Sequence, residues 1–188
     1  MKIITILGSP RKKGNTAAIL KAFEEVVMAQ HEVERINIAD ISIQGCLGCD
    51  ACQRTLDEPG CVQRDDFNEV MAKIRLADLV VYASPVYVWD FPAQMKALMD
   101  RHYCLVKWAD PAHMCCLLEG KHVMLLATCG GSAEENGDLI QEVFRREMEY
   151  LHCRILGKYI APFCTTPSEI GDQARQIAQQ MAADMLKL

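Results

Sequence analysis

The sequence lacks the features of several classes of protein. Its longest apolar runs have the length of a strand, so no transmembrane helix is expected. Lysine and arginine form no stripe beyond residues 11–13 and the net charge is −5, so nucleic acid is not an expected partner. Met1 and Lys2 lead directly into an apolar run, which leaves no room for a signal peptide and predicts a cytoplasmic protein. Without repeats or linkers, residues 1–188 are predicted to form one globular domain.

Two common nucleotide-binding motifs are also missing. There is no G-x-G-x-x-G for a dinucleotide and no G-x-x-x-x-G-K-S/T for a nucleoside triphosphate with magnesium. Residues 3–16 nevertheless read as a buried strand, a basic loop and a helix start at Asn15 and Thr16, which are good capping residues. Such a helix start is an anion site, and here it gathers Ser9, Arg11, Lys12, Lys13, Asn15 and Thr16. This pattern favours the terminal phosphate of a mononucleotide such as FMN, and the alternative is a solvated turn with capping residues.

Strand and helix patterns alternate along the chain. Strands are predicted at residues 3–7, 32–38, 78–84, 121–128 and 153–161, with helices at 16–29, 66–76, 93–103, 138–151 and 168–186. Pro92 is expected to start the third helix and Ser168 to cap the last one. Residues 104–120 fit no repeat and are expected to be an excursion. The alternation predicts an α/β fold with a doubly wound, five-stranded parallel sheet of order 2-1-3-4-5.

The carboxyl ends of the predicted strands bring three loops to one edge of the sheet. The loop at residues 84–92 is stiffened by Pro85 and Pro92 and holds Tyr87, Trp89 and Phe91. A rigid aromatic loop with amide donors suits a planar ring such as isoalloxazine, although these aromatic residues also suit a sheet edge or a subunit contact. The turn at residues 128–132 is either a close approach of backbone to a ligand or an ordinary flexible turn.

Ten cysteines in a chain without an export signal are expected to be reduced. Cys46, Cys49 and Cys52 follow a C-x₂-C-x₂-C spacing, with Cys61 further on, so their thiolates suit a 4Fe–4S cluster or zinc; free or redox-active thiols are the alternative. The other sulfurs in apolar surroundings are interpreted as small buried hydrophobes: Cys104, Cys115, Cys116, Cys153 and Cys164. The histidines are scattered and interpreted as surface or structural residues: His31, His102, His113, His122 and His152.

Three motifs in this order resemble a known family. Gly-Ser-Pro-Arg-x-x-Gly-Asn-Thr at 8–16, Ser-Pro-Val-Tyr at 84–87 and Pro-Ala-x-x-Lys-x-x-x-Asp-Arg at 92–101 are similar to the NAD(P)H-dependent FMN reductases of the flavodoxin-like proteins. Within that family the chain resembles the iron-sulfur flavoproteins, although the gap before Cys61 is longer than theirs. The resemblance extends from residue 1 to about residue 131.

The resemblance implies a flavodoxin-like fold that binds FMN and takes NAD(P)H as co-substrate. The implied cofactor-binding residues are Ser9, Arg11, Lys13, Asn15 and Thr16 at the phosphate, Pro85, Val86, Tyr87, Val88 and Trp89 at the ring, and Thr128, Cys129, Gly130 and Gly131 at the other edge. No catalytic residue is implied, because the flavin carries the chemistry. The resemblance also implies a homodimer or homotetramer and a small-molecule or protein acceptor.

Three functions remain open from the sequence, the third and weakest being a flavin- or nucleotide-binding regulator with no turnover. The first is an FMN-dependent NAD(P)H oxidoreductase with an unidentified acceptor. The second is an iron-sulfur flavoprotein that carries electrons, with a cluster on Cys46, Cys49, Cys52 and Cys61.

Overall fold

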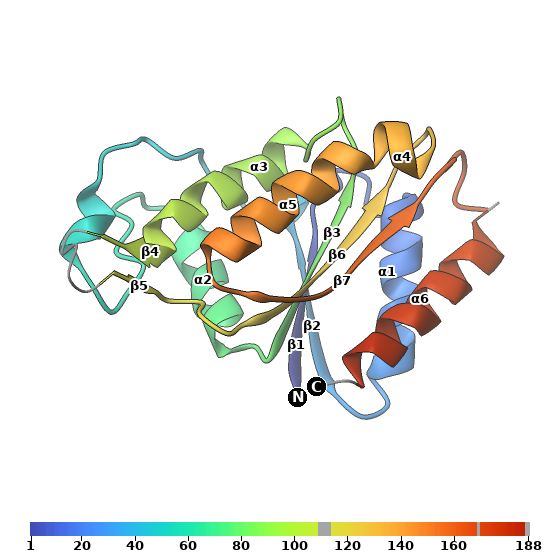
Figure 1. Cartoon of the computed structure of the whole chain (residues 1–188), viewed down its shortest axis with the longest axis horizontal. Coiled ribbons are helices and arrows are strands. Elements are labelled where there is room, and N and C mark those ends of the chain that lie inside the picture. Colours follow the sequence, from blue (N-terminus) through green and yellow to red (C-terminus); the bar gives the residue numbers. More distant parts are fainter. Residues whose placement is uncertain (109–113, 169, 187–188) are drawn as a thin grey trace.

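The computed structural model describes residues 1–108, 114–168 and 170–186. Its centre is a five-stranded parallel sheet with the order β2-β1-β3-β6-β7, which confirms the predicted 2-1-3-4-5 arrangement and the flavodoxin-like fold (Figure 1). Its central strands are continuous apolar runs because helices cover both of their faces. The strands of this sheet are β1 (Lys2–Leu7), β2 (Glu32–Asn37), β3 (Leu79–Pro85), β6 (His122–Thr128) and β7 (Arg154–Ala161).

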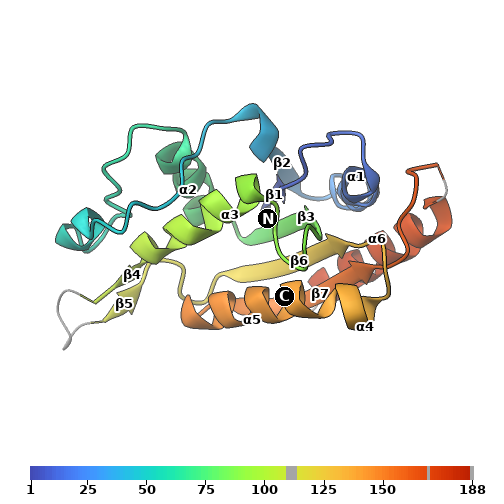
Figure 2. The ribbon, with the colours of Figure 1, turned by 90° about the horizontal axis from the view of Figure 1, so that it is seen from above.

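Helices form a layer on each face of the sheet (Figure 2). Helices α1 and α6 pack together on one face, whereas α2, α3 and α5 cover the other. Within the described residues, no helix is long and apolar enough to cross a membrane. The helices are α1 (Asn15–Val27), α2 (Phe67–Leu76), α3 (Ala93–Asp100), α4 (Ala133–Asn136), α5 (Asp138–Tyr150) and α6 (Gly171–Met185), with 3₁₀ turns η1 (Ile38–Asp40), η2 (Ala51–Arg54) and η3 (Arg101–Leu105).

Three expected helix ends are wrong. Gly14 occupies the N-cap position of α1, so Asn15 and Thr16 lie inside the helix and make no capping bond. Ser168 does not cap α6, because its hydroxyl shares a 3.1 Å hydrogen bond with Thr166 and the helix begins only at Gly171. Helix α3 ends at Asp100 and continues as the 3₁₀ turn η3, which accounts for the longer helix expected there.

A buried ion pair fixes α1 against the sheet. Glu24 of α1 is buried and accepts hydrogen bonds from the Thr5 hydroxyl of β1 at 2.6 Å and from Nε of Arg35 in β2 at 2.9 Å. The carboxylate therefore links one helix to two adjacent strands through charge-assisted bonds. This link sets the position of α1. The first turn of α1 belongs to the segment at residues 9–16 where the sequence predicts a phosphate site, which we call the phosphate loop.

The predicted excursion between α3 and β6 is confirmed. After η3 the chain forms β4 (Val106–Lys107) and β5 (Cys115–Cys116), a short antiparallel pair outside the main sheet. This pair lies at the same end of the molecule as the predicted cysteine-rich loop at residues 44–64, as both views show (Figures 1 and 2). We call this segment, which carries Cys46, Cys49, Cys52 and Cys61, the cysteine loop. Of the histidines, His113 lies outside the described residues.

Candidate functional site

The loops that follow β1, β3 and β6 enclose a cavity of about 610 Å³. We call it the phosphate-loop cavity. Its volume is typical of a small-molecule site, and it lies where the doubly wound fold places ligands. It is lined by Ser9, Arg11, Lys12, Lys13, Gly14, Asn15, Thr16, Pro85, Tyr87, Thr128, Thr165 and Pro167.

All of the predicted phosphate residues line this cavity, but part of the predicted ring site does not. Ser9, Arg11, Lys13, Asn15 and Thr16 come together with Pro85, Tyr87 and Thr128. The other proposed cofactor residues lie outside the lining: Val86, Val88, Trp89, Cys129, Gly130 and Gly131. The sequence analysis missed Thr165 and Pro167, which approach the cavity from the segment after β7.

The phosphate loop is a closed turn. The Ser9 hydroxyl accepts the Arg11 amide at 3.1 Å, and the Gly14 amide donates to the Arg11 carbonyl at 3.1 Å. The first bond inside α1 runs from Ala18 to Gly14 at 3.0 Å, so the amides before Ala18 have no acceptor within the helix. These amides and the positive end of the helix dipole make the loop suitable for an anion.

Asn15 carries an unsatisfied polar atom beside the cavity. Its side-chain Oδ1 is buried and has no hydrogen-bond partner among the described residues. Buried polar atoms without a partner are uncommon in folded proteins, and each calls for an explanation, one of which is a bound group. The atom therefore supports a ligand at this end of the cavity.

The three cations of the loop are not equivalent. Lys12 pairs with Asp40, and the hydrogen bond from its ammonium group lowers the pKa of that carboxyl. Among the described residues, no carboxylate pairs with Arg11 or Lys13, and both line the cavity. Arg11 and Lys13 are thus the cations that remain for an anionic ligand.

Several backbone amides of the loop after β3 donate hydrogen bonds to carbonyls of the protein itself. The Val86 amide donates to the Thr128 carbonyl at 2.8 Å, and Tyr87 and Asp90 exchange backbone hydrogen bonds of 2.9 and 3.1 Å. Val88 and Trp89 form the tip of this tight turn, with φ of 51° and 64°. Trp89 is held by a 2.8 Å bond from its indole N–H to the Glu135 carbonyl. The loop therefore presents Pro85 and the Tyr87 side chain to the cavity.

Val88 is expected to be a site of backbone strain. A β-branched residue in the left-handed region costs about 1–2 kcal/mol, whereas asparagine tolerates that region. Val88 is 87% exposed, so packing does not repay this cost. We expect Val88→Asn to raise the free energy of unfolding in a urea titration by about 1 kcal/mol. Val62→Asn, at another exposed valine outside the positive-φ set, is the control, and an equal effect of the two variants would rule out strain at Val88.

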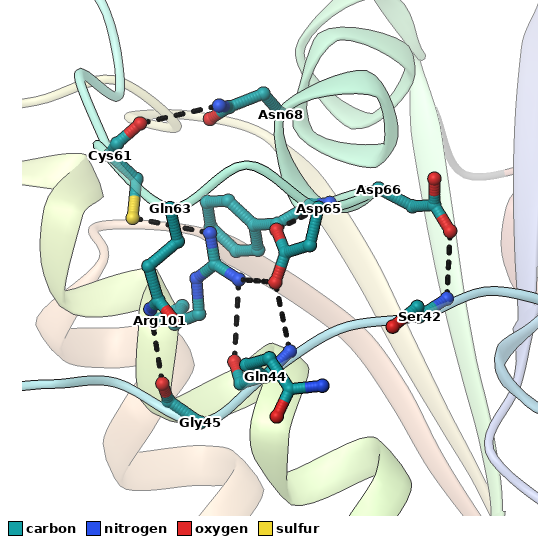
Figure 3. A network of polar contacts seen from close by, with 10 residues as sticks. Ser42, Gln44, Gly45, Cys61, Gln63, Asp65, Asp66, Asn68 and Arg101 are labelled. Atoms are coloured by element: carbon teal, nitrogen blue, oxygen red, sulfur yellow. Dashed lines mark hydrogen bonds and ion pairs between the residues drawn. The ribbon is translucent and has the colours of Figure 1, made fainter.

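The four loop cysteines line one small cavity at the other end of the molecule. We call it the cysteine pocket; it has a volume of about 20 Å³ and is lined by Cys46, Leu47, Cys49, Asp50, Cys52, Cys61, Val62, Gln63, Arg101, Tyr103 and Cys104. The Gly48 amide donates to Cys46 Sγ at 3.4 Å, and the Arg101 guanidinium donates to Cys61 Sγ at 3.2 Å (Figure 3). Such N–H···S bonds suit thiolate ligands.

The cysteine pocket supplies the donor set for a metal group but not its closed geometry. Within the described residues, no three Cys, His, Asp or Glu side chains are arranged to hold a metal ion. Cys46 and Cys49 are exposed, Cys52 is buried and Cys61 is half-buried. Gathering the thiolates around a metal group requires the two exposed side chains to turn inward.

Of the remaining cysteines that were expected to be buried, Cys104 and Cys116 are buried, whereas Cys153 and Cys164 are half-buried. Burial raises the pKa of Cys104 and of Cys153 to about 12, and that of Cys164 to about 11, so these thiols stay protonated. Cys115 is the exception: it is exposed, because its side chain and that of the buried Cys116 point to opposite faces of β5. The interpretation of Cys115 as a buried hydrophobe is therefore wrong.

The fold and the position of the phosphate-loop cavity define a flavodoxin-like protein. The sequence model described as NADPH-dependent FMN reductase matches residues 1–164. The chain belongs to this family and is an NAD(P)H-dependent FMN oxidoreductase. The match extends beyond residue 131, where the sequence analysis expected the similarity to become weak.

Related sequences point to the same branch of the family. The chain is similar to an iron-sulfur flavoprotein of Archaeoglobus fulgidus, with 34% identity over 97% of this chain and 78% of that protein. An iron-sulfur flavoprotein of Methanosarcina thermophila is 41% identical over 56% of this chain. That match covers 54% of the Methanosarcina protein, so the chain spans about half the length of this relative.

Solved structures support the fold. The structure of an NAD(P)H:quinone oxidoreductase from Methanothermobacter marburgensis has a TM-score of 0.73 at 20% identity, covering 96% of this chain and 98% of that one. An FMN-dependent NADH-azoreductase of Bacillus anthracis, in complex with FMN, has a TM-score of 0.70 at 14% identity, covering 98% and 99%. These likenesses show the flavodoxin-like fold.

Proposed function

We propose that this protein binds FMN in the phosphate-loop cavity and passes reducing equivalents from NAD(P)H to a small-molecule or protein acceptor. The observation that carries the proposal is the composition of that cavity. One end offers amides, hydroxyls and the cations Arg11 and Lys13 to a phosphate, and the other offers Pro85 and Tyr87 to a planar ring. The unpartnered Asn15 oxygen, an acceptor at the phosphate end, supports a ligand that also carries a hydrogen-bond donor there.

The residues of the cavity act by binding and positioning. The Thr16 and Thr128 hydroxyls share a 2.7 Å hydrogen bond, which ties the phosphate loop to the end of β6. When bound, FMN supplies hydride acceptance and transfer. The cavity lining contains no histidine and no carboxylate among the described residues, so the protein contributes orientation and positive charge.

A second candidate function is that of an electron carrier with a 4Fe–4S cluster on Cys46, Cys49, Cys52 and Cys61. Two observations favour it: the four thiols line one pocket with N–H donors to two of the sulfurs, and relatives named iron-sulfur flavoproteins are 34–41% identical. When bound, the cluster supplies one-electron transfer. Zinc and free thiols remain the alternatives to be tested, because thiolates alone do not select the metal.

The test is the visible spectrum of protein purified without oxygen, before and after addition of NADPH. We expect a yellow protein that bleaches with NADPH, which supports the oxidoreductase. A brown protein that only a protein donor reduces supports the carrier. A colourless protein that FMN does not reconstitute would overturn both, as would a crystal grown with excess FMN in which the phosphate loop is empty.

A further inference from the structure

The excursion after α3 brings two buried cations to the cysteine pocket. Arg101 in η3 and Lys107 in β4 are each only 1% exposed. A buried cation is unfavourable unless a negative charge or a full set of hydrogen bonds compensates it. The partners of these two side chains therefore indicate what the neighbouring pocket holds.

Arg101 is shared between a carboxylate and a thiol (Figure 3). Its guanidinium pairs with Asp65 and donates to Cys61 Sγ at 3.2 Å and to the Gln44 carbonyl at 3.3 Å. The guanidinium also lies 3.9 Å from the centre of the Phe67 ring. Asp65 neutralises this cation, and two other N–H groups bond to Gln44 and Cys61, toward either end of the cysteine loop, whereas Nε has no partner among the described residues.

Lys107 has no such neutralising partner. Its ammonium donates to the Cys52 carbonyl at 2.9 Å and to the Pro59 carbonyl at 3.1 Å, and both acceptors are uncharged. In the described parts of the chain, no carboxylate pairs with it. A buried positive charge thus lies directly behind Cys52, beside a pocket whose lining includes five thiols.

The excursion and the cysteine loop are locked together. The side-chain amide of Gln53 donates from Nε2 to the Val106 carbonyl at 2.9 Å, and its Oε1 accepts the backbone N–H of Trp108 at 3.1 Å. The Tyr103 hydroxyl donates to the Asp50 carboxylate at 2.9 Å. These bonds hold η2 of the loop against β4 on both sides of Lys107. Arg101 therefore lines the pocket, and Lys107 is held directly behind it by its bond to the Cys52 carbonyl.

We propose that Lys107 and Arg101 are positioning residues of the cysteine pocket: Lys107 balances the negative charge of the thiolates, and Arg101, whose own charge Asp65 neutralises, donates a hydrogen bond to the Cys61 sulfur. They favour metal binding by Cys46, Cys49, Cys52 and Cys61, and they raise the reduction potential of a bound cluster, because the reduced cluster carries one more negative charge. The part of this inference that concerns the potential rests on the proposed cluster. The part that concerns metal binding does not, because any metal on four thiolates leaves a net negative charge to compensate.

The test compares Lys107→Met with the wild-type protein in two measurements made without oxygen. The first is a cobalt(II) titration of the metal-free protein, followed by thiolate-to-cobalt absorption; we expect the variant to bind cobalt at least about tenfold more weakly. The second is a redox titration of the reconstituted cluster; we expect a tenfold shift toward the oxidised form, which equals about 59 mV toward more negative potential. Lys107→Arg keeps the charge and should restore both values.

Lys121→Met is the matched control. Lys121 also donates to two backbone carbonyls, those of Arg75 and Ala77. Neither of these residues lines the cysteine pocket, whereas Lys107 donates to Cys52, which does. We expect this variant to keep the wild-type cobalt affinity and potential. An equal loss in the two lysine variants would overturn the inference, because it would reflect a general loss of stability.

The remaining outcomes are distinguishable. An unchanged cobalt affinity or an unchanged potential in Lys107→Met overturns the role of the cations and leaves a cluster found in the wild type standing. A wild-type protein that binds cobalt but no iron overturns the proposed cluster, and the cobalt comparison alone then decides the role of Lys107. A wild-type protein that binds neither metal overturns both.

If Lys107→Met does not fold, as judged by circular dichroism, Lys107→Gln takes its place, because it keeps a donor for the Cys52 carbonyl.

Discussion

Replacing Arg11 with alanine is expected to weaken FMN binding by about 1.5–3 kcal/mol, the usual range for a hydrogen bond to a charged group. This is a loss of about tenfold to more than a hundredfold in affinity. The reason is that Arg11 lines the phosphate-loop cavity and has no carboxylate partner among the described residues. Fluorescence titration of metal- and flavin-free protein with FMN measures the effect.

Lys12→Ala is the control for a general effect of charge. Lys12 is one residue away and carries the same charge as Arg11, but its ammonium group is already paired with the Asp40 carboxylate. We expect its loss to change FMN affinity much less than that of Arg11. Equal affinities of Arg11→Ala and the wild type would remove Arg11 from the phosphate site, and equal losses in both variants would show a long-range charge effect without a specific contact.

Replacing Cys49 with serine is expected to abolish the iron content of the anaerobically prepared protein and to leave FMN bound. A cluster on four cysteines depends on each thiolate, because serine is a poor ligand for iron in such a site. FMN should remain because the phosphate-loop cavity and the cysteine pocket share no lining residue and are built on different loops. Iron analysis and flavin release on the same sample measure both effects.

Cys115→Ser is the matched control for Cys49→Ser. Both thiols are exposed, but Cys115 lies on β5 and does not line the cysteine pocket. It should retain iron and FMN. Retention of iron in Cys49→Ser would remove this residue from the proposed ligand set, and joint loss of iron and FMN would show that the two loops depend on one another.

The fold was predictable because each central strand is a continuous apolar run followed by a helix pattern. The same local signals predicted a site at Ser9, Arg11 and Asn15, and these residues line one cavity because they are neighbours in sequence as well as in space. Helix ends were less predictable: Ser168 has the right residue type for a cap, but its hydroxyl bonds to Thr166.

The missed features depend on contacts between distant segments. Thr165 and Pro167 reach the cavity only because β7 ends beside β6, and their own neighbourhood in sequence gives no sign of this. The left-handed backbone of Val88 and Trp89 was hidden because neither position carries glycine or asparagine. Lys107 lies in the stretch that fits no repeat, and its burial follows from contacts with residues 52 and 59, which no local pattern shows.

The hydroxyl pair of Thr16 and Thr128 has a consequence for how the empty and filled cavities differ. Each hydroxyl has one proton to give, and without a ligand either oxygen can be the donor in their 2.7 Å bond. An anion that accepts the Thr16 proton leaves Thr128 as the donor to Thr16, so the bond acquires one direction. A chain of hydrogen bonds aligned in this way is polarised and strengthened along its length. An anion bound at Thr16 would therefore also set the direction of a hydrogen bond at the carboxyl end of β6, two strands away from β1.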